Sequence, residues 1–409
     1  MKKIRVRGMC VGLVVALLAV TAASCGNGNG GDGGKTTIKA GYITDLTGVI
    51  ASVMRPHYLA YHDVCSYLNE NDPIPGGQLQ LDTYDTQFDP GRWIPAYEWV
   101  RGKGAKLLFS PMPQASETYI PFLSKDKMPN FTPTCTGPMM ESDWTYSVGM
   151  TVDGQWMGAL KWVEDNWDQY PQKPKIATVG WNTQYEWDVV NAIEKYVLAR
   201  PDKFDYVGAF LAPAGTVSWS MEIEKIKDCE WIGPCHGGGT GMATFVYEFR
   251  NKGYTDNRFF SGEAMPCWVS LMVDKAGWGA VNDTISHGAW PWWSDNYEIV
   301  KVCKELLTAN HPDEAEDTMY AGVGYIAAFF QMYFVYQLVK ATAEDVGVEN
   351  VTGQAIQAHA TNFTYDFGGI PPFDFGTDRT SVKYGAVYEW SAAEETLLRI
   401  TDWLLAPTQ

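Results

Sequence analysis

Residues 37–48 read TIKAGYITDLTG, and this stretch decides the class of fold. Its first half is rich in apolar and β-branched residues, as expected of a buried strand, and its second half is a polar loop that ends in Gly48. Residues 58–68 follow with apolar residues at helical spacing, and residues 79–84 read as the next apolar strand. A strand, a loop, a helix and a second strand in this order predict a parallel sheet covered by helices.

The same alternation continues along the chain. Further helices are predicted at 89–101, 116–124, 156–167, 189–199 and 240–252, and further strands at 106–109, 130–132, 175–180 and 206–210. We therefore predict an α/β fold with two series of parallel-sheet units. Ligand-facing loops lie at the carboxyl ends of such strands, so two series indicate two lobes on either side of a cleft. A later apolar run, 321–339, is interrupted by Gln331 and Gln337 and is predicted to be a buried helix, not a membrane span.

The first 24 residues have the features of a signal peptide. Basic residues precede a short apolar run over 11–20, and small residues lead to Cys25. These small residues resemble the lipobox of bacterial lipoproteins, although Ala22 stands where Leu is commonest. The resemblance implies that Cys25 carries a lipid and that residues 25–34, nearly all Gly with Asn and Asp, form a flexible tether. The alternative is a secreted protein that is cleaved near Ala23, with Cys25 as an odd thiol.

Charge, cysteines and motifs exclude several classes of function. The net charge of −17 argues against a nucleic-acid partner, because binding phosphates requires clustered Lys and Arg. The cysteines of an exported protein can be oxidised to disulfides outside the cytoplasm. Cys229 and Cys235 bracket a loop short enough for a local disulfide, although the sequence leaves the connectivity open. The chain has no HExxH, CxxC or GxSxG spacing. We predict no metal, no cofactor and no enzymatic activity.

Six stretches, in their order and spacing, resemble the type I periplasmic binding proteins of the branched-chain amino-acid (Leu/Ile/Val-binding) class. They are IKAGYITDLTG (38–48), DTQFDP (85–90), FSPMPQAS (109–116), PNFTPTCT (129–136), KIATVGWNTQY (175–185) and FFSGE (259–263). The resemblance implies two Rossmann-like lobes, with parallel sheets flanked by helices, joined by a hinge that the chain crosses three times. By resemblance, lobe 1 comprises 35–151 plus 290–343, and lobe 2 comprises 152–289 plus 344–409.

The resemblance also implies a binding site for an amino-acid zwitterion. On the first lobe, the ligand carboxylate would meet the side chains of Gln114, Ser116 and Thr136 and the main-chain amides of Ala115 and Thr134. Main-chain N–H groups at the start of a helix favour an anion. The alternative is that Gln114 and Thr136 only cap the helices that follow them.

On the facing lobe, the resemblance assigns the ligand's ammonium group to Glu263. Tyr185 would offer a hydroxyl group and a ring face, and Tyr320 would line the side-chain pocket from the hinge side. The alternatives are that Glu263 is a solvated loop acid and that Tyr185 is a partly buried aromatic residue.

Two features depart from the family's pattern. Residues 236–241 read HGGGTG where relatives commonly carry an aromatic residue, which is predicted to remove side-chain volume and to enlarge that wall. The neighbourhood is also rich in tryptophan, whose rings can hold an aromatic or cationic ligand or can simply pack in the core and hinge. These residues are Trp181, Trp187, Trp268, Trp290, Trp292 and Trp293.

The function implied by the resemblance is that of a solute-binding lipoprotein of an ABC importer. It would capture an amino acid or a related small polar solute in the cleft by hinge closure. Its partners would be ABC permease subunits and, through the lipid anchor, the membrane. We expect a monomer outside the cytoplasm, on the outer face of the cell membrane or in the periplasm. The alternative is a ligand-sensing module of the same fold that reports to a membrane receptor.

Overall fold

The first of two large sheets is built around strand β2. The computed structural model of the protein describes residues 5–7, 35–169, 171–236 and 239–407. The sheet has five parallel strands in the order β3-β2-β4-β5-β6. They are β2 (Thr36–Thr44), β3 (Gly77–Asp85), β4 (Leu107–Phe109), β5 (Asn130–Thr132) and β6 (Thr145–Ser147). Because β2 lies inside the sheet and helices cover both faces, its apolar run is almost continuous.

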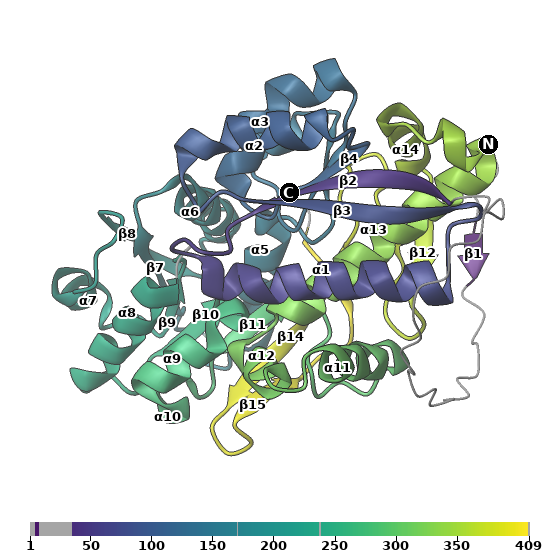
Figure 1. Ribbon diagram of the computed structural model, residues 1–409. Coiled ribbons are helices and arrows are strands. Elements are labelled where there is room, and N and C mark those ends of the chain that lie inside the picture. The colour runs from purple at the N-terminus through teal and green to yellow at the C-terminus, as the bar shows by residue number, and fades with distance from the viewer. Residues whose placement is uncertain (1–4, 8–34, 170, 237–238, 408–409) are drawn as a thin grey trace, which may run out of the picture.

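Helices cover this sheet on both sides. Figure 1 shows α1 on one side of β2 and β3, with α2 and α3 on the other. Their bounds are α1 (Ala51–Asn71), α2 (Trp93–Gly102), α3 (Pro113–Asp126) and α4 (Gly137–Met140). The predicted helix opening at Asp89 is confirmed, since its side chain accepts a hydrogen bond of 2.8 Å from the N–H of Gly91. A single 3-10 turn, η1 (Pro90–Arg92), therefore precedes α2.

The second sheet has the order β15-β14-β11-β10-β9-β7-β8, with the short β16 pairing with β14. Its strands are β7 (Lys175–Trp181), β8 (Asp205–Ala212), β9 (Trp231–Pro234), β10 (Arg258–Ser261), β11 (Ile285–Gly288), β14 (Tyr384–Ser391), β15 (Thr396–Arg399) and β16 (Leu404–Leu405). The helices around it are α5 (Val152–Asn166), α6 (Gln184–Leu198), α7 (Ser220–Ile226), α8 (Gly239–Asn251), η2 (Met265–Trp268), α9 (Val269–Ala276) and α10 (Trp278–Val281).

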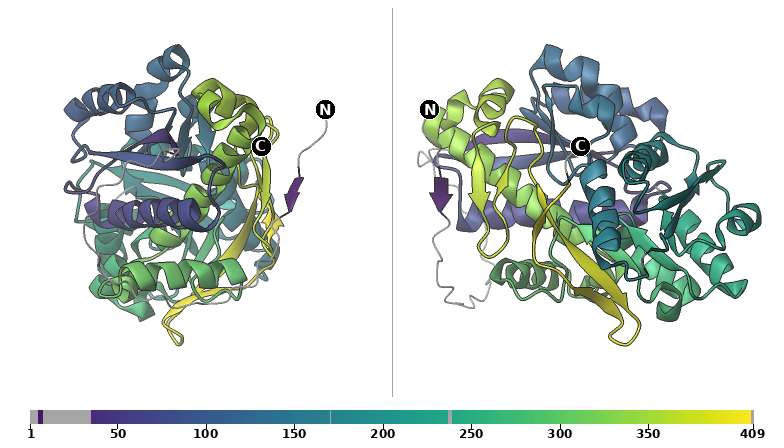
Figure 2. Two further views of the ribbon diagram at one scale, coloured as in Figure 1. Left: turned by 45° about the vertical axis from the view of Figure 1, so that its right-hand side comes forward. Right: turned by 180° about the vertical axis from the view of Figure 1, so that it is seen from behind.

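One edge of the second sheet is antiparallel. Strands β7 to β11 are parallel, whereas β14 runs antiparallel to β11 and β15 antiparallel to β14. Only antiparallel strands can be joined by a tight turn, as β14 and β15 are here. Figure 2 shows this yellow hairpin from behind, running from the middle of the molecule to its lower edge. The α/β class with parallel sheets is confirmed, as is each strand and helix predicted between residues 37 and 252, with shifted ends.

A third set of elements begins after β11. It comprises α11 (Glu298–Asn310), α12 (Ala315–Ala321), α13 (Gly324–Val346), η3 (Val348–Asn350), α14 (Gly353–Ala360), β12 (Thr364–Asp366) and β13 (Phe373–Asp374), and β12 also pairs with β1 (Arg5–Arg7).

The predicted buried helix is α13, which packs along α1. The two glutamines that interrupt its apolar run bond to groups of that neighbour. Gln331 accepts a hydrogen bond of 2.9 Å from the hydroxyl of Tyr61, and Gln337 donates one of 2.8 Å to Asp72. Among the described residues no single helix is long and apolar enough to span a membrane, and the pair α12 and α13 is bent by 94°.

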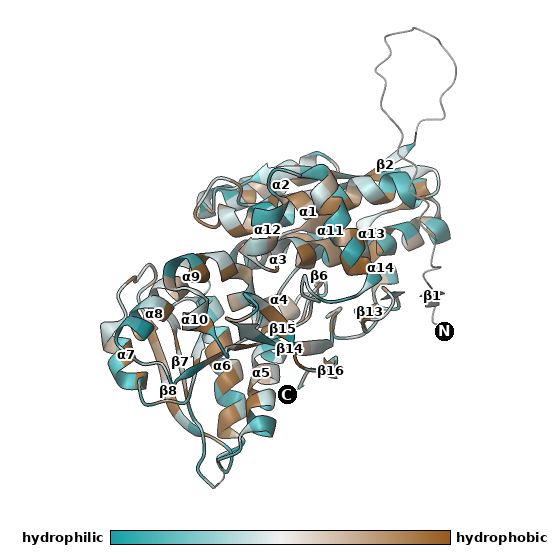
Figure 3. Cartoon of the chain, turned by 90° about the horizontal axis from the view of Figure 1, so that it is seen from below, coloured by the Kyte–Doolittle hydropathy of each residue, from teal (hydrophilic) through white to brown (hydrophobic). Residues whose placement is uncertain are grey.

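The chain passes more than once between the two sheets. After β11 it returns to the first sheet, where α11 and α13 contact α1. The segment that follows stays there, because Phe375 packs on Phe131 and Tyr146 and Thr380 forms a bridge with Ser147. The chain then rejoins the second sheet at β14, and β15 and β16 follow in the same sheet. Figure 3 shows the resulting groups, α1, α2, α11 and α13 in one and α6 to α10 in the other. The division into two lobes is a proposal. Its boundary at residue 344 needs a correction, because residues 375–380, assigned above to lobe 2, pack on the first sheet.

Candidate functional site

Three of the predicted site residues lie at the start of α3. Met112 is the residue before α3, and no side chain forms a capping hydrogen bond at the start of this helix. The alternative that Gln114 caps the helix is therefore wrong. Ser116 is fully buried, and its hydroxyl donates a hydrogen bond of 3.0 Å to the carbonyl of Ser110. Ser116 therefore fixes the loop that leads into the helix. The amides of the first helical turn, at Gln114 and Ala115, have no partner further back in the helix.

Ser110 is a site candidate that the sequence analysis missed. It is the first residue after β4, it is fully buried, and its hydroxyl has no hydrogen-bond partner among the described residues. Its signal in the sequence is its place, since the first polar residue after a parallel strand stands at the ligand-facing edge of the sheet.

The loop after β5 brings Thr136 against a carboxylate. Thr136 precedes α4 without capping it, so the capping alternative is wrong here too. Its hydroxyl instead donates a hydrogen bond of 2.5 Å to Glu117 of α3. Thr134 accepts a hydrogen bond of 3.2 Å at its carbonyl from Thr132, which holds the loop in place. Glu117, which the sequence analysis did not single out, thus makes this wall partly acidic.

The first turn of α6 carries Tyr185. The side chain is partly buried, and burial raises the pKa of its hydroxyl far above the ordinary range, with smaller contributions from Glu186 and the thiol of Cys267. Asp188 follows three residues later and therefore shares a helix face with Tyr185. Burial raises the pKa of Asp188 as well, and the carboxylates of Glu117 and Asp153 add to that rise. This turn of α6 consequently lies near groups from both sides of the predicted site.

Glu263 follows β10 and is held by the main chain of a neighbouring strand end. Its carboxylate accepts a hydrogen bond of 2.8 Å from the N–H of Ala289, and its own N–H donates to the side chain of Gln155 at 3.2 Å. Burial raises the pKa of Glu263 to about 7, although the bond from Ala289 opposes the rise. Because its carboxylate is hydrogen-bonded and its pKa is raised by burial, Glu263 is not the ordinary solvated loop acid that was considered as an alternative. Since Cys267 lies close enough to Tyr185 and to Glu263 to interact with both, these two predicted residues share one neighbourhood.

Tyr320 makes a contact between two helices. It lies in α12, its side chain is 40% exposed, and its hydroxyl donates a hydrogen bond of 2.7 Å to Asp274 of α9. Burial and the carboxylate of Asp274 raise the pKa of Tyr320 to about 12. This bond joins α12, which follows β11 in the chain, to α9, a helix of the second sheet. A role for Tyr320 in lining a ligand pocket stays a prediction.

At Gly239 and Gly241 of the HGGGTG stretch the missing side chains do not enlarge the wall, which corrects the expectation from sequence for these two positions. Residues 237 and 238 lie outside the described residues. A Cβ atom on Gly239 would lie 2.4 Å from the ring of Trp268, and one on Gly241 would lie 2.7 Å from the ring of Trp181. Two of the tryptophans therefore fill the volume that the glycines leave. His236 is fully buried beside Trp219, with ring centroids 4.6 Å apart.

A disulfide between Cys229 and Cys235 is not formed, and both thiols are free. Strand β9, residues 231–234, lies between them. An extended strand of this length spans roughly 10 Å, which exceeds the Cα separation of about 7 Å that a disulfide can bridge. The loop predicted from the short spacing is a buried strand of the second sheet, and this is why the pairing fails.

A cavity of about 670 Å³ lies between segments that belong to the two sheets. Thr136 is the one predicted ligand residue on its wall. The other lining side chains are supplied mainly by the start of α5, by Asp188 and Asn191 of α6, and by residues 378–383 and 405–407 near the C-terminus. This volume falls in the range typical of small-molecule sites, about 300–1,000 Å³.

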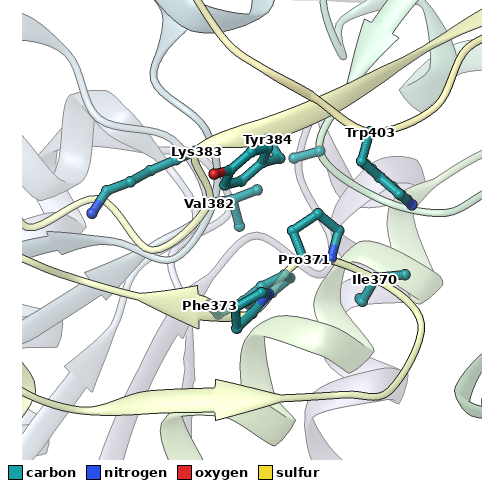
Figure 4. A pocket seen from close by; sticks show the side chains of 9 residues that line it. Ile370, Pro371, Phe373, Val382, Lys383, Tyr384 and Trp403 are labelled. Atoms are coloured by element: carbon teal, nitrogen blue, oxygen red, sulfur yellow. The ribbon is translucent and has the colours of Figure 1, made fainter. Parts of the chain in front are cut away.

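A second cavity is far smaller. It measures about 10 Å³ and is lined by residues such as Pro371, Phe373, Tyr384 and Trp403, which Figure 4 shows arranged around it. That is about the volume needed for a single water molecule. Among the described residues no group of three or more His, Cys, Asp or Glu side chains could hold a metal ion.

The predicted leader and tether are mostly outside the described residues. Of residues 1–34 the structure describes only Arg5–Arg7, which form β1. The predicted lipid-modified Cys25 is not among them.

Comparison with known proteins gives one family and one fold. The family model described as periplasmic binding protein matches residues 37–395. No curated protein matches the chain.

Three similar solved structures illustrate the fold. A branched-chain amino acid ABC transporter protein from Thermus thermophilus with bound valine has a TM-score of 0.77 at 13% identity, covering 91% of this chain and 97% of that one. A solute-binding protein from R. palustris in complex with 4-hydroxybenzoate has a TM-score of 0.75 at 14% identity, covering 90% and 97%. A fatty acid ABC transporter substrate-binding protein from Thermomonospora curvata has a TM-score of 0.75 at 15% identity, covering 91% and 93%.

Proposed function

This chain belongs to the periplasmic binding protein family, and we propose that it is the extracytoplasmic solute-binding lipoprotein of an ABC importer. It captures a small polar solute, an amino acid or a related molecule, between its two lobes and delivers it to permease subunits as a monomer. The observation that carries the proposal is the cavity of about 670 Å³ whose walls come from segments of both sheets. A solute that contacts both walls stabilises the closed arrangement of the lobes over the open one.

Predicted binding residues outside the lining of this cavity support a ligand with separated charges. The first turn of α3, with Gln114 and Ala115, offers N–H groups to an anion. Glu263 offers an acid that burial keeps poised between its charged and neutral forms. An ammonium group at Glu263 favours the carboxylate form by direct attraction. The solved structures with bound valine and 4-hydroxybenzoate are of the same fold, so polar solutes of this size are reasonable candidates.

Non-enzymatic capture is the simplest use of such a site. The sequence offers no nucleophile-and-base spacing, and the similar structures are solute-binding and transporter proteins. Incubation of the protein with esters and amides followed by product analysis tests this directly. Turnover of any of them would contradict a purely binding role.

The binding role is tested by a thermal-shift and native mass-spectrometry screen over amino acids, amides, amines and aromatic acids. A bound solute raises the melting temperature by mass action. Glu263→Gln should then weaken an ammonium-bearing solute severely in calorimetry, because the neutral amide cannot pair with the cation. An unchanged Kd would remove Glu263 from the site. The matched control is Glu316→Gln, which neutralises an exposed carboxylate of α12.

The lipid anchor is a separate part of the proposal. Cys25 after a run of small residues supports lipid modification, and the Gly-rich residues 26–34 suit a tether. Cys25→Ser should release the protein from the membrane fraction into the medium or periplasm while leaving solute binding unchanged. Membrane retention of the variant would show that another segment anchors the chain.

A further inference from the structure

The cavity of about 670 Å³ has an excess of negative charge on its wall. Asp153, at the start of α5, and Asp188, in α6, both line it. Neither carboxylate forms an ion pair with a described lysine or arginine. One lysine, Lys383, also lines the cavity, but its ammonium group is already held by Asp374 at 2.9 Å and Asp378 at 3.6 Å. The wall therefore offers two carboxylates without a cation.

Two buried polar atoms at the cavity lack partners. Thr380 lines the cavity, is only 5% exposed, and its hydroxyl has no hydrogen-bond partner among the described residues. One carboxylate oxygen of Asp188 is buried and without a partner as well, while the other accepts a hydrogen bond of 3.0 Å from Gln184. Leaving a buried polar atom unpaired is costly, so both atoms point to a missing binding partner.

A third carboxylate, that of Glu117, lies close enough to Asp188 to interact with it. Glu117, which accepts the hydrogen bond from Thr136, and Asp153 both raise the pKa of Asp188, in addition to the rise caused by burial. Three acidic groups from three helices thus act together around the cavity. A cation placed among them relieves their mutual repulsion, whereas an anion increases it.

Much of the remaining wall is apolar, beside polar residues such as Thr151 and Asn191. Its side chains include Met140, Met150, Val152, Val382 and Leu405. These surfaces favour the methylene groups of a ligand over a hydrated inorganic ion.

We propose that the solute carries an ammonium group at the end of an alkyl chain. This group lies between Asp153 and Asp188, and the chain packs against the apolar part of the cavity. Thr380 accepts a hydrogen bond from the same ammonium group or from a water molecule bound to it. The inference rests on the proposed function, because the cavity shares Thr136 with the predicted binding site. It narrows the solute from small polar molecules in general to molecules with an ammonium group at the end of an alkyl chain, such as diamines and basic amino acids.

The test uses lysine and norleucine, which differ only in the terminal ammonium group, together with cadaverine, which lacks the carboxylate. Calorimetry on the full chain should give lysine or cadaverine a Kd at least about tenfold below that of norleucine, the order expected for a hydrogen bond to a charged group. Equal binding of lysine and norleucine overturns the inference.

Substitutions at Asp153 and Asp188 test whether these two residues cause the preference for lysine over norleucine. Asp153→Asn and Asp188→Asn should each reduce the preference for lysine over norleucine by about tenfold. Melting temperatures show whether both variants fold. Asp313→Asn, an exposed carboxylate after α11, is the matched control and should leave the preference unchanged. Retention of the full preference in both cavity variants overturns the assignment.

The set of solutes that is tested also separates this inference from the proposed function. Binding of valine or 4-hydroxybenzoate, with no binding of lysine or cadaverine, overturns the inference and leaves the solute-binding role intact. Binding of no solute at all, either from this set or from spent culture medium, overturns both.

Discussion

The carboxylate of Glu263 accepts a hydrogen bond of 2.8 Å from the N–H of Ala289, which ties the end of β10 to the loop after β11. This bond favours the charged carboxylate, while burial favours the neutral acid and prevails, raising the pKa to about 7. The group is therefore held at a fixed place with its charge close to balance at neutral pH. Such a group suits the recognition of a cation, because an arriving ammonium group completes its ionisation.

The raised pKa of Glu263 predicts a pH dependence of the ligand-free protein. A folded-state pKa of about 7, above the ordinary 4.5, means that the folded protein holds this proton more tightly than the unfolded chain. The contribution of Glu263 to stability is therefore fully present below pH 4.5 and is lost as the pH rises through 7. Glu263→Gln should remove this loss, on the order of 2 kcal/mol after solvent screening.

The measurement is the melting temperature of both proteins between pH 4.5 and pH 8. The difference between Glu263→Gln and the parent should grow in favour of the variant as the pH rises. Glu316→Gln, on an exposed part of α12, should follow the parent. A constant difference across this range is incompatible with a raised pKa at Glu263.

The Thr136 hydroxyl is predicted to position Glu117 for the ligand. Thr136→Val keeps the shape of the side chain but removes the donor to Glu117, a bond of 2.5 Å. Loss of one hydrogen bond to a charged group should weaken solute binding by about tenfold or more. Thr118→Val is the control, because that hydroxyl donates only to the carbonyl of Gln114 within α3. Equal effects of the two substitutions on Kd would assign Thr136 a purely structural part.

Gly239 is predicted to be required for the packing of Trp268. In Gly239→Ala the new methyl group would lie 2.4 Å from the indole ring, so the ring or the start of α8 must shift. Overpacking of this kind costs about 1–3 kcal/mol. Gly279→Ala, in α10, meets nothing within 4 Å and should be neutral or slightly stabilising. Denaturant unfolding of the two variants decides the matter, and equal stabilities would contradict the close packing.

Cys229 and Cys235 are predicted to remain thiols even in the exported protein. The intervening strand β9 keeps them apart, and burial raises the pKa of Cys229 to about 12, so its reactive thiolate is scarce. Alkylation after denaturation without a reducing agent, followed by mass spectrometry, should label both residues. Finding a peptide in which the two are linked would refute the observed separation.

Local patterns in the sequence were sufficient for the architecture. The apolar run of β2, its polar loop and the helix after it predict a parallel α/β unit, because strand and helix periodicity are properties of neighbouring residues. The same holds for Asp89, whose place before Pro90 predicts the helix opening that the structure contains. The apolar run interrupted by Gln331 and Gln337 likewise predicted a buried helix. In the structure these glutamines bond to Tyr61 of α1 and to Asp72 at its end.

The binding surfaces were decided only by the tertiary structure. The partner of Glu263 is Ala289, the volume left by Gly239 is filled by Trp268, and Asp188 faces carboxylates from α3 and α5. Each of these relationships joins segments far apart in the chain. Sequence periodicity reports which face of an element is apolar, but burial and electrostatic neighbours depend on how distant elements pack, and these set the charge and the shape of a site.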